Sequence, residues 1–447
     1  MNIIICGAGQ VGSHAAEVLA AAADNDITVI DTNPDRLRAI EDTMDVATIV
    51  GNCAQADILR EAGCGSADLL VAATSSDEVN LLSASIAKSV GAAKSIARVH
   101  HSAFFEQRGL HYQDHLGIDQ LICPEYSTSM AIARTLRNPG ALAIEDFARG
   151  AIEMQEFAVS RKAQAVGRKL MDLPLPGGTR VAAISRKGGS FIPDGTTAIG
   201  EDDIIILVGN AAVYQEARRL FHDEKVGRTR IVIMGGPPMG VWLCRALRDR
   251  SFAIRLFETD RPRAEELAEK LGWVTVVNAD PTDQTVFKDE NLAQAGVFVA
   301  LLDDDEQNIL GCAWAKSMGV PNAIAVVQRP NYLHLLTHVG IDKAFSPRRV
   351  AVKEIENVVD ESPLRRTASL AEGVIDVYRL RVGKHADMLG KPLREVNLSP
   401  NWIIAAIQHG GDVHVPKADD TIDAGDTLLV IGRHGREGAL RKLFHAG

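Results

Sequence analysis

The sequence lacks any long apolar run. No segment of its 447 residues approaches 18 consecutive uncharged apolar residues, so no membrane-spanning helix is expected. Basic residues are also in deficit: 48 Lys and Arg against 58 Asp and Glu give a net charge of −10, which argues against nucleic acid as the main partner. The N-terminus enters a strand pattern directly, without a basic leader. We therefore expect a cytoplasmic protein that reaches a membrane only through a partner.

Paired metal and disulfide motifs are missing as well. The six cysteines contain no CxxC pair, so they are predicted to be reduced residues of the core or of strand ends. His111 and His115 stand at helical i, i+4 spacing, but no HExxH pattern accompanies them. Surface or capping histidines are the main interpretation, a metal ligand pair is the alternative, and we expect no metal site.

Catalytic motifs are missing too. The sequence contains no GxSxG, GKS/T or HExxH, and no tyrosine is followed by lysine at the fourth position. A dehydrogenase needs an acid or base beside its cofactor and a pocket for its substrate. We therefore predict that the protein is not an enzyme and that a nucleotide acts on it as a signal.

What the sequence does contain is a strand, tight turn, helix and strand in residues 2–31. The apolar run 3–6 leads into GAGQVG at residues 7–12. Gly7 permits the turn, Gly9 lets the backbone approach a pyrophosphate, and Gly12 lets the helix pack closely on the sheet. The phosphates would lie at the helix N-terminus, where unpaired N–H groups favour negative charge. A nucleotide site is the favoured interpretation, and a glycine turn that serves only packing is the alternative.

Asp31 ends the second apolar run, 19 residues after Gly12. A carboxylate at this place can accept hydrogen bonds from an adenosine ribose. It also repels a 2′-phosphate, so NAD(H) is favoured over NADP(H) as the ligand.

Strand and helix patterns then alternate along the first part of the chain. Helices are predicted over 34–44, 54–62 and a segment ending at residue 90, and strands over 46–50, 68–73, 94–99 and 118–122. Together with the first two strands, this indicates a doubly wound Rossmann domain of about six parallel strands over residues 1–124, with the ligand at the carboxyl ends of the strands. An alternating β pattern with a closing helix follows, and it predicts a small α+β lobe over 142–226.

Both patterns occur twice. An offset of 228 residues relates Gly7 to Gly235 and Gly12 to Gly240, and an offset of 223 relates Asp203 to Asp426. The number of identities at each offset indicates duplication. The fold class is therefore α/β, with Rossmann-like lobes at 1–124 and 229–350 alternating with small α+β lobes at 142–226 and 370–447.

The two Rossmann copies are not equivalent. Pro237 stands at the position of Gly9, where it has no N–H to offer a phosphate. The turn that begins with Thr74-Ser75 in the first copy becomes Leu302-Asp303-Asp304, whose acids would repel a pyrophosphate. We predict a degenerate phosphate loop in the second copy. For residues 303–306, a solvated helix cap is the main interpretation and a cation site the alternative.

The GAGQVG turn, Asp31, the segment GNCAQADILREAG and the following ATSSDEVNLLSASIAKSVGAAKSIARV resemble the nucleotide-binding lobe of RCK (also called KTN) domains. Two such lobes alternating with two small lobes are similar to the TrkA family, the peripheral subunits of the bacterial Trk potassium-uptake system. The resemblance implies a cytoplasmic regulatory ring, expected to be a homotetramer, beneath a membrane potassium subunit resembling TrkH. Exchange of NAD(H) or of ATP and ADP would gate potassium flow.

The resemblance also implies the site. Gly7, Ala8, Gly9, Gln10, Val11 and Gly12 would hold phosphate, Asp31 the ribose, Asn52 and Cys53 the adenine end, Thr74 and Ser75 the edge of the cleft, and Arg98 phosphate charge, within the chain or across a subunit interface. Asn52 stands where an aspartate is common in the family. An ordinary ion pair at the strand end is the alternative for Arg98. Two other functions stay open, an NAD-dependent oxidoreductase and a nucleotide sensor of a different transporter.

Overall fold

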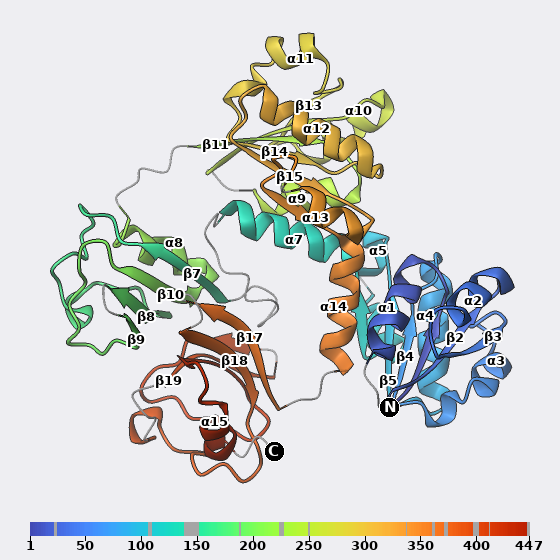
Figure 1. Ribbon diagram of the computed structural model, residues 1–447, viewed down its shortest axis with the longest axis horizontal. Helices are drawn as coiled ribbons and strands as arrows, with labels where there is room; N and C mark the ends of the chain where they lie inside the picture. The colour runs from blue at the N-terminus through green and yellow to red at the C-terminus, as the bar shows by residue number, and fades with distance from the viewer. Residues whose placement is uncertain are drawn as a thin grey trace. The chain divides into compact units, whose positions relative to one another are not determined.

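The computed structural model (Figure 1) describes residues 1–21, 25–105, 110–137, 152–186, 189–222, 228–248, 251–336, 338–359, 363–370, 374–396, 402–410 and 412–444. The chain forms two compact units. One comprises Met1–Ala133 and Val226–Glu361, and the other comprises Arg134–Lys225 and Ser362–Gly447. The predicted lobe boundaries at 142, 226 and 447 lie outside the described residues.

The first Rossmann lobe is built on a six-stranded parallel sheet of order β3-β2-β1-β4-β5-β6. Its strands are β1 (Asn2–Cys6), β2 (Asp26–Asp31), β3 (Ala47–Val50), β4 (Leu69–Ala72), β5 (Lys94–Arg98) and β6 (Gln120–Ile122). Its helices are α1 (Gln10–Ala20), α2 (Pro34–Glu41), α3 (Ala56–Glu61), α4 (Asp77–Val90), α5 (Ser102–Phe105), α6 (Tyr112–His115) and α7 (Pro124–Arg137).

Strand β1 explains why this sheet reads as continuous apolar runs in the sequence. Ile3 and Ile5 pack into one buried cluster, whereas Ile4 and Cys6 pack into another. Side chains alternate between the faces of a strand, so both faces of the sheet are covered. The parallel order and the covered faces confirm the predicted α/β class and the doubly wound topology.

The second Rossmann lobe repeats this order as β13-β12-β11-β14-β15-β16. Its strands are β11 (Thr229–Met234), β12 (Phe252–Phe257), β13 (Thr275–Val277), β14 (Val297–Ala300), β15 (Asn322–Val326) and β16 (Lys343–Phe345). Its helices are α9 (Pro238–Ala246), α10 (Arg261–Lys270), α11 (Gln284–Asp289), α12 (Asp305–Ser317), α13 (Leu333–Leu336) and α14 (Pro347–Val359).

The last helix of each Rossmann lobe packs against the other lobe (Figure 1). From α14, Ala351, Val352 and Ile355 belong to the buried cluster that contains Val11 and Ala15 of α1. These contacts bury an apolar stripe at helical spacing.

Helix α7 makes the reciprocal contact. Ser129 Oγ donates to the carbonyl of Met239 at 2.9 Å. The ring of Tyr126 also meets the Trp242 ring edge-on, with centroids 5.6 Å apart. The two Rossmann lobes are thus joined through a shared core.

The other unit contains the two small lobes, each with an antiparallel sheet. The first has the order β7-β10-β8-β9 and the second the order β17-β18-β21-β19-β20. Their elements are β7 (Ile152–Ala158), β8 (Thr179–Arg186), β9 (Gly189–Phe191), β10 (Ile204–Asn210), α8 (Ala211–Arg219), β17 (Leu364–Leu370), β18 (Ile375–Arg381), β19 (Trp402–His409), β20 (Asp412–His414), β21 (Thr427–Arg433) and α15 (Glu437–Phe444). The alternating β pattern predicted within 142–226 corresponds to β7, β8 and β10, whereas the short strand β9 was not predicted.

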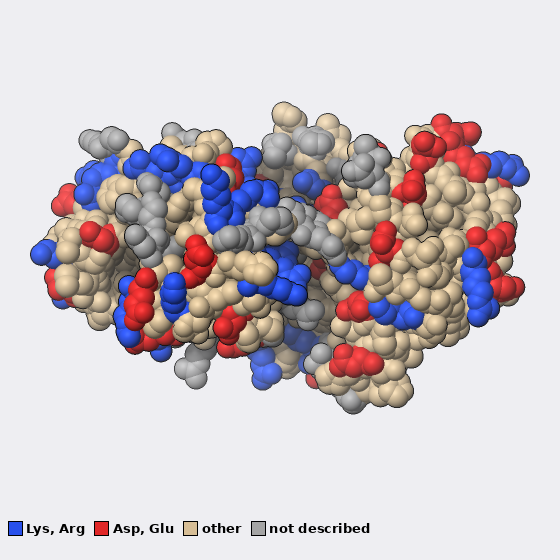
Figure 2. All heavy atoms as spheres, turned by 90° about the horizontal axis from the view of Figure 1, so that it is seen from below, with Lys and Arg blue, Asp and Glu red and all other residues tan. Residues whose placement is uncertain are grey.

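The two small lobes share a buried apolar cluster to which both sheets contribute. Arg180 of the first small lobe donates to the carbonyls of Ile404 and Pro416 of the second, at 3.0 and 2.9 Å. Over the face drawn in Figure 2, basic side chains lie beside acidic ones.

Candidate nucleotide-binding site

A cavity of about 550 Å³ lies at the carboxyl ends of the strands of the first Rossmann lobe. This is the edge at which open parallel sheets bind ligands. Ten of the twelve residues predicted for the site line it: Gly7, Gly9, Gln10, Val11, Asp31, Asn52, Cys53, Thr74, Ser75 and Arg98. Ala8 and Gly12 are buried behind this lining. The structure therefore brings the predicted residues together, and their role in binding stays a prediction.

The three glycines of the turn have different surroundings. Gly7 has φ +103°, and a Cβ there would lie 3.0 Å from the carbonyl oxygen of Ala73. A Cβ on Gly12 would lie 1.8 Å from the carbonyl oxygen of Gly7, whereas one on Gly9 would meet nothing within 4 Å. Gly7 and Gly12 are thus required by the fold, and Gly9 leaves open space where a phosphate would approach α1.

Asp31 connects the turn to the next helix. Its Oδ2 accepts a hydrogen bond from Ala8 N at 2.6 Å, and its Oδ1 accepts one from Asn33 N at 2.8 Å. Each carboxylate oxygen can accept more than one hydrogen bond, so the side chain can hold the turn and still face a ribose.

The loop after β4 is held by Asn80. Its Oδ1 accepts from Thr74 N at 2.8 Å and from Thr74 Oγ1 at 2.7 Å, and its Nδ2 donates to Arg98 O at 2.9 Å. Ser76 Oγ accepts from Val79 N and donates to a carboxylate oxygen of Glu78. The hydroxyl of Thr74, a residue predicted to lie at the edge of the cleft, therefore donates within the loop itself.

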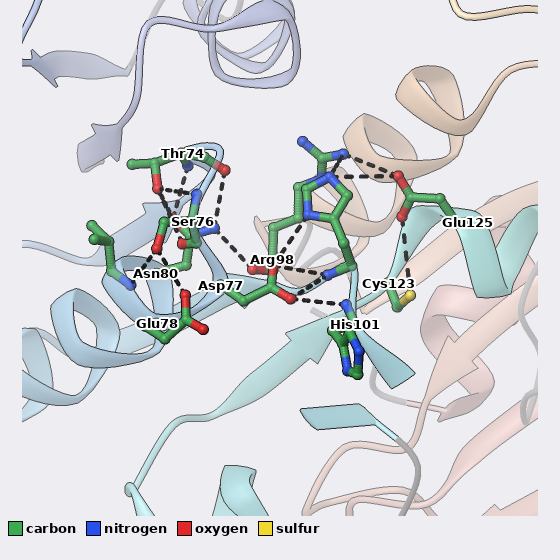
Figure 3. A network of polar contacts seen from close by, with 11 residues as sticks. Thr74, Ser76, Asp77, Glu78, Asn80, Arg98, His101, Cys123 and Glu125 are labelled. Atoms are coloured by element: carbon green, nitrogen blue, oxygen red, sulfur yellow. Dashed lines mark hydrogen bonds and ion pairs between the residues drawn. The ribbon is translucent and has the colours of Figure 1, made fainter. Parts of the chain in front are cut away.

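Arg98 belongs to a polar network at the end of β5 (Figure 3). Its Nη2 donates to Glu125 Oε1 at 3.1 Å, so the ion pair considered as an alternative for Arg98 is present beside the cavity. Asp77 accepts from the backbone N–H groups of His100 and His101 at 2.9 and 2.8 Å. The ring Nδ1 of His100 lies 3.1 Å from Asp77, which leaves its Nε2 to accept from Arg98.

Cys53 is a buried thiol on the cavity wall. A hydrogen bond with Cys6 lowers the pKa of Cys53 to about 7, against the opposing effect of burial. The same hydrogen bond and burial raise the pKa of Cys6. The other predicted residue of this segment, Asn52, accepts from Ala54 N at 3.0 Å and shapes the turn.

The second lobe uses the equivalent turn differently. Gly236 N donates to Glu258 Oε2 at 3.0 Å, as Ala8 does to Asp31. Arg263, however, donates from Nε and Nη2 to the carbonyl of Gly236 at 3.2 and 3.0 Å. Pro237 is the N-cap of α9, where it offers no N–H. The turn is thus engaged by the lobe's own side chains.

The acidic segment after β14 caps helix α12. Asp304 Oδ1 accepts from Gln307 N at 2.7 Å, and Asp305 accepts from the backbone N–H groups of Gln328 and Arg329. Among the described residues, no group of three or more His, Cys, Asp or Glu side chains is placed to hold a metal ion.

Several lining residues were not predicted, above all Arg36, His100, Gln328 and Arg348. The histidine at position 100 is the repeat counterpart of Gln328 at the offset of 228. The repeat places Gln328 at a strand end of the second lobe, but it carries no signal that this end faces the first lobe's cavity.

The fold and the cavity define the class of protein: two Rossmann-type lobes, one with an open nucleotide-type cleft, combined with two small α+β lobes. Within the described ranges, no helix is both long and apolar enough to cross a membrane. The TrkA-N domain family matches residues 3–124 and 231–347, and the TrkA-C domain family matches 154–222 and 377–445.

Individual proteins agree with these matches. The Trk system potassium uptake protein TrkA of Vibrio alginolyticus is 33% identical over 444 residues, covering 96% of this chain and 95% of that protein. The TrkA homolog of Archaeoglobus fulgidus is 32% identical over 445 residues, covering 99% of this chain and 100% of that protein. The chain belongs to the TrkA family.

Solved structures share the fold. The GsuK channel bound to NAD has a TM-score of 0.60 at 18% identity, over 100% of this chain and 79% of that one. The GsuK RCK domain has a TM-score of 0.59 at 17% identity, over 100% and 95% of the two chains.

Proposed function

We propose that this chain is a nucleotide-sensing regulatory subunit of a potassium-uptake system. The observation that carries the proposal is the cavity of the first lobe, where the glycine turn, Asp31 and Arg98 converge. Full-length relatives are named Trk system potassium uptake proteins. Structures with the same fold are described as GsuK bound to NAD and GsuK bound to ADP.

The ligands are NAD(H), ATP and ADP, and Asp31 disfavours the 2′-phosphate of NADP(H). The subunit acts at the cytoplasmic face of the membrane as a homotetramer, bound to a membrane potassium subunit resembling TrkH. A ligand shifts the equilibrium between two conformations of the assembly only by the difference between its binding free energies for those conformations.

The hydrogen bonds and ion pairs that the polar side chains at the cavity already make favour nucleotide binding without catalysis. His100 bridges Arg98 and Asp77, and Glu125 pairs with Arg98. These groups already have structural partners, which argues against their service as acid or base in hydride transfer.

The test is potassium flux into proteoliposomes that contain the membrane subunit and this chain. We expect ATP, ADP and NADH to change the flux, and Asp31→Arg to abolish the response while Glu258→Arg, the matched change in the second lobe, retains it. Flux that ignores all three nucleotides would refute the proposal. Consumption of NADH in a substrate screen would favour an oxidoreductase instead.

A further inference from the structure

Three cysteines lie in one buried cluster of the first Rossmann lobe: Cys6 at the end of β1, Cys53 in the loop after β3, and Cys64 after α3. All three are free thiols. Cys53 lines the cavity of about 550 Å³, whereas Cys6 and Cys64 are 0% exposed and do not line it. Cys6 is the strand partner of Ile30, which does line the cavity. The fold therefore places one thiol in the cavity wall and a second directly behind that wall.

The thiols of Cys53 and Cys6 are hydrogen-bonded to each other. This bond lowers the pKa of Cys53, against the effects of burial and of the Asp31 charge. The same bond, together with burial, raises the pKa of Cys6. Cys6 therefore keeps its proton and donates it to the sulfur of Cys53. A thiolate that faces a cavity, with a protonated thiol beside it, is the arrangement found in redox-sensing thiol pairs.

The burial of Cys53 selects the size of the oxidant. Its side chain is 4% exposed, so a bulky disulfide such as oxidised glutathione cannot approach its sulfur without opening the lobe. Hydrogen peroxide is only about twice the size of a water molecule, and the cavity holds many water-sized molecules. The cavity thus gives a small peroxide a route to Cys53 that a large oxidant lacks.

We propose that Cys53 and Cys6 are a redox-sensing thiol pair, which a hydroperoxide converts to a disulfide in the wall of the nucleotide cavity. In a reducing compartment such as the cytoplasm, a disulfide of this kind is transient and acts as a signal.

The chemistry balances in two steps. The Cys53 thiolate attacks one oxygen of hydrogen peroxide, so that an S–O bond forms, the O–O bond breaks and hydroxide leaves. The sulfur of Cys6 then attacks the sulfenic acid, so that an S–S bond forms and a second hydroxide leaves. The two thiol protons convert the two hydroxides to water. Two electrons pass from the sulfurs to the peroxide, and a cellular thiol returns them when it reduces the disulfide.

The disulfide would change the wall of the cavity. Gly51 N donates to the carbonyl of Asp31 at 3.0 Å, and Asn52 Oδ1 accepts from Ala54 N at 3.0 Å. The loop that carries Cys53 is therefore tied to the end of β2 and to its own turn. A covalent bond to Cys6 draws Cys53 closer to β1 than a hydrogen bond does, and the loop must follow. Oxidation should therefore weaken a nucleotide, and by linkage the nucleotide should disfavour oxidation.

The effect on nucleotides rests on the proposed function, whereas the disulfide itself does not. The experiment treats the full chain with limited hydrogen peroxide, blocks the remaining thiols and digests the chain with trypsin. Cleavage after Lys and Arg places Cys6 in peptide 1–36, Cys53 in 39–60 and Cys64 in 61–88. Mass spectrometry should find 1–36 linked to 39–60, and dithiothreitol should release the two peptides. Calorimetry should find that ADP binds the oxidised chain at least about fivefold more weakly than the reduced chain.

The matched control is Cys64→Ser, which removes a thiol of the same cluster and should leave both the link and the ADP response intact. Cys53→Ser should abolish both, and Cys6→Ser should leave Cys53 as a sulfenic acid that dimedone traps. Thermal unfolding should show that each variant is folded, and the link in the wild type is measured without any substitution.

Two results would overturn the inference. One is a native chain in which Cys53 is oxidised without a link to Cys6, or is linked to Cys64 instead. The other is a link between Cys53 and Cys6 that leaves the affinity for ADP unchanged, which would overturn its role as a switch. If the wild type forms the link but binds no ADP in either state, the proposed function fails and the thiol pair stands.

Discussion

The backbone N–H of Ala8 donates to Oδ2 of Asp31 at 2.6 Å. In the second lobe the N–H of Gly236 donates to Oε2 of Glu258 at 3.0 Å, although that turn contains Pro237 and is engaged by Arg263. The contact between turn and acid is therefore part of the Rossmann framework in both copies, and in the first copy the acid also lines the cavity of about 550 Å³.

Asp31→Ala and Glu258→Ala form a matched pair. Each removes a carboxylate that accepts a backbone N–H, so each should lower the free energy of unfolding of the Rossmann unit by about 1.5–3 kcal/mol. Only Asp31→Ala should also weaken NADH and ATP. Urea unfolding and calorimetry measure the two effects, and equal loss of nucleotide affinity in both variants would contradict the assignment of the site to the first lobe.

Gly9→Ala and Gly12→Ala should separate binding from folding. A methyl group on Gly9 enters open space, so stability should change by less than about 1 kcal/mol. The same methyl occupies the phosphate approach, and nucleotide affinity should fall at least about tenfold.

The methyl group on Gly12 collides instead with backbone at 1.8 Å. That variant should lose about 3 kcal/mol or more of stability, because backbone cannot rotate away as a side chain can. Thermal unfolding and calorimetry of both variants provide the check. A stable Gly12→Ala that binds nucleotide normally would contradict this geometry.

Cys53 should react first among the six thiols. Its pKa of about 7 makes roughly half of it thiolate at neutral pH, whereas burial raises the pKa values of Cys64, Cys123, Cys244 and Cys312. Its rate of alkylation should rise with pH through about 7 and then level off, as measured by mass spectrometry of peptides. Saturating ADP should protect it, because the thiol lines the cavity.

Cys6→Ala is the control for this prediction. The change removes the hydrogen bond that stabilises the Cys53 thiolate, so the midpoint of the rate profile should move to higher pH. An unchanged midpoint would mean that Cys6 does not set the reactivity of Cys53.

The second small lobe should lose stability as pH rises, and the first should not. His409 pairs with Asp426 at 2.6 Å, and this hydrogen bond raises the pKa of His409. Its stabilisation is therefore complete below about pH 6.5, the unfolded value, and is lost as pH rises through the higher folded value. At the equivalent place in the first small lobe, Arg186 pairs with Asp203 at 2.6 Å and stays charged.

His409→Arg tests this dependence. The variant should unfold at the same denaturant concentration as the wild type or a higher one at pH 8, and its advantage should shrink toward pH 6. The quantity to measure is the difference between the two pH profiles, so that other titrating groups cancel. A difference that is flat from pH 6 to 8 would contradict the role of His409.

Much of each lobe was predictable because its signals are local. The apolar runs around Ile3 and Leu70 predicted strands, and the glycines at 7 and 12 predicted the turn. In the structure Asn80 and its repeat counterpart Asn308 hold the same loop in both lobes. Short edge strands such as β9 (Gly189–Phe191) were missed, because three residues are too few to show alternation.

By itself the sequence determined the α/β class, the duplication, the inequality of the two phosphate turns and the side of the sheet on which the cavity lies. These follow from periodicity, from the special backbone freedom of glycine and from the rule that parallel strands end at one edge. Only the tertiary structure decided that Arg98 pairs with Glu125, that helices α7 and α14 pack on the opposite lobes, and that Arg348 lines the first lobe's cavity. The apolar pattern of a helix predicts which of its faces is buried. It does not predict which surface covers that face, because this depends on packing between residues hundreds of positions apart in the chain.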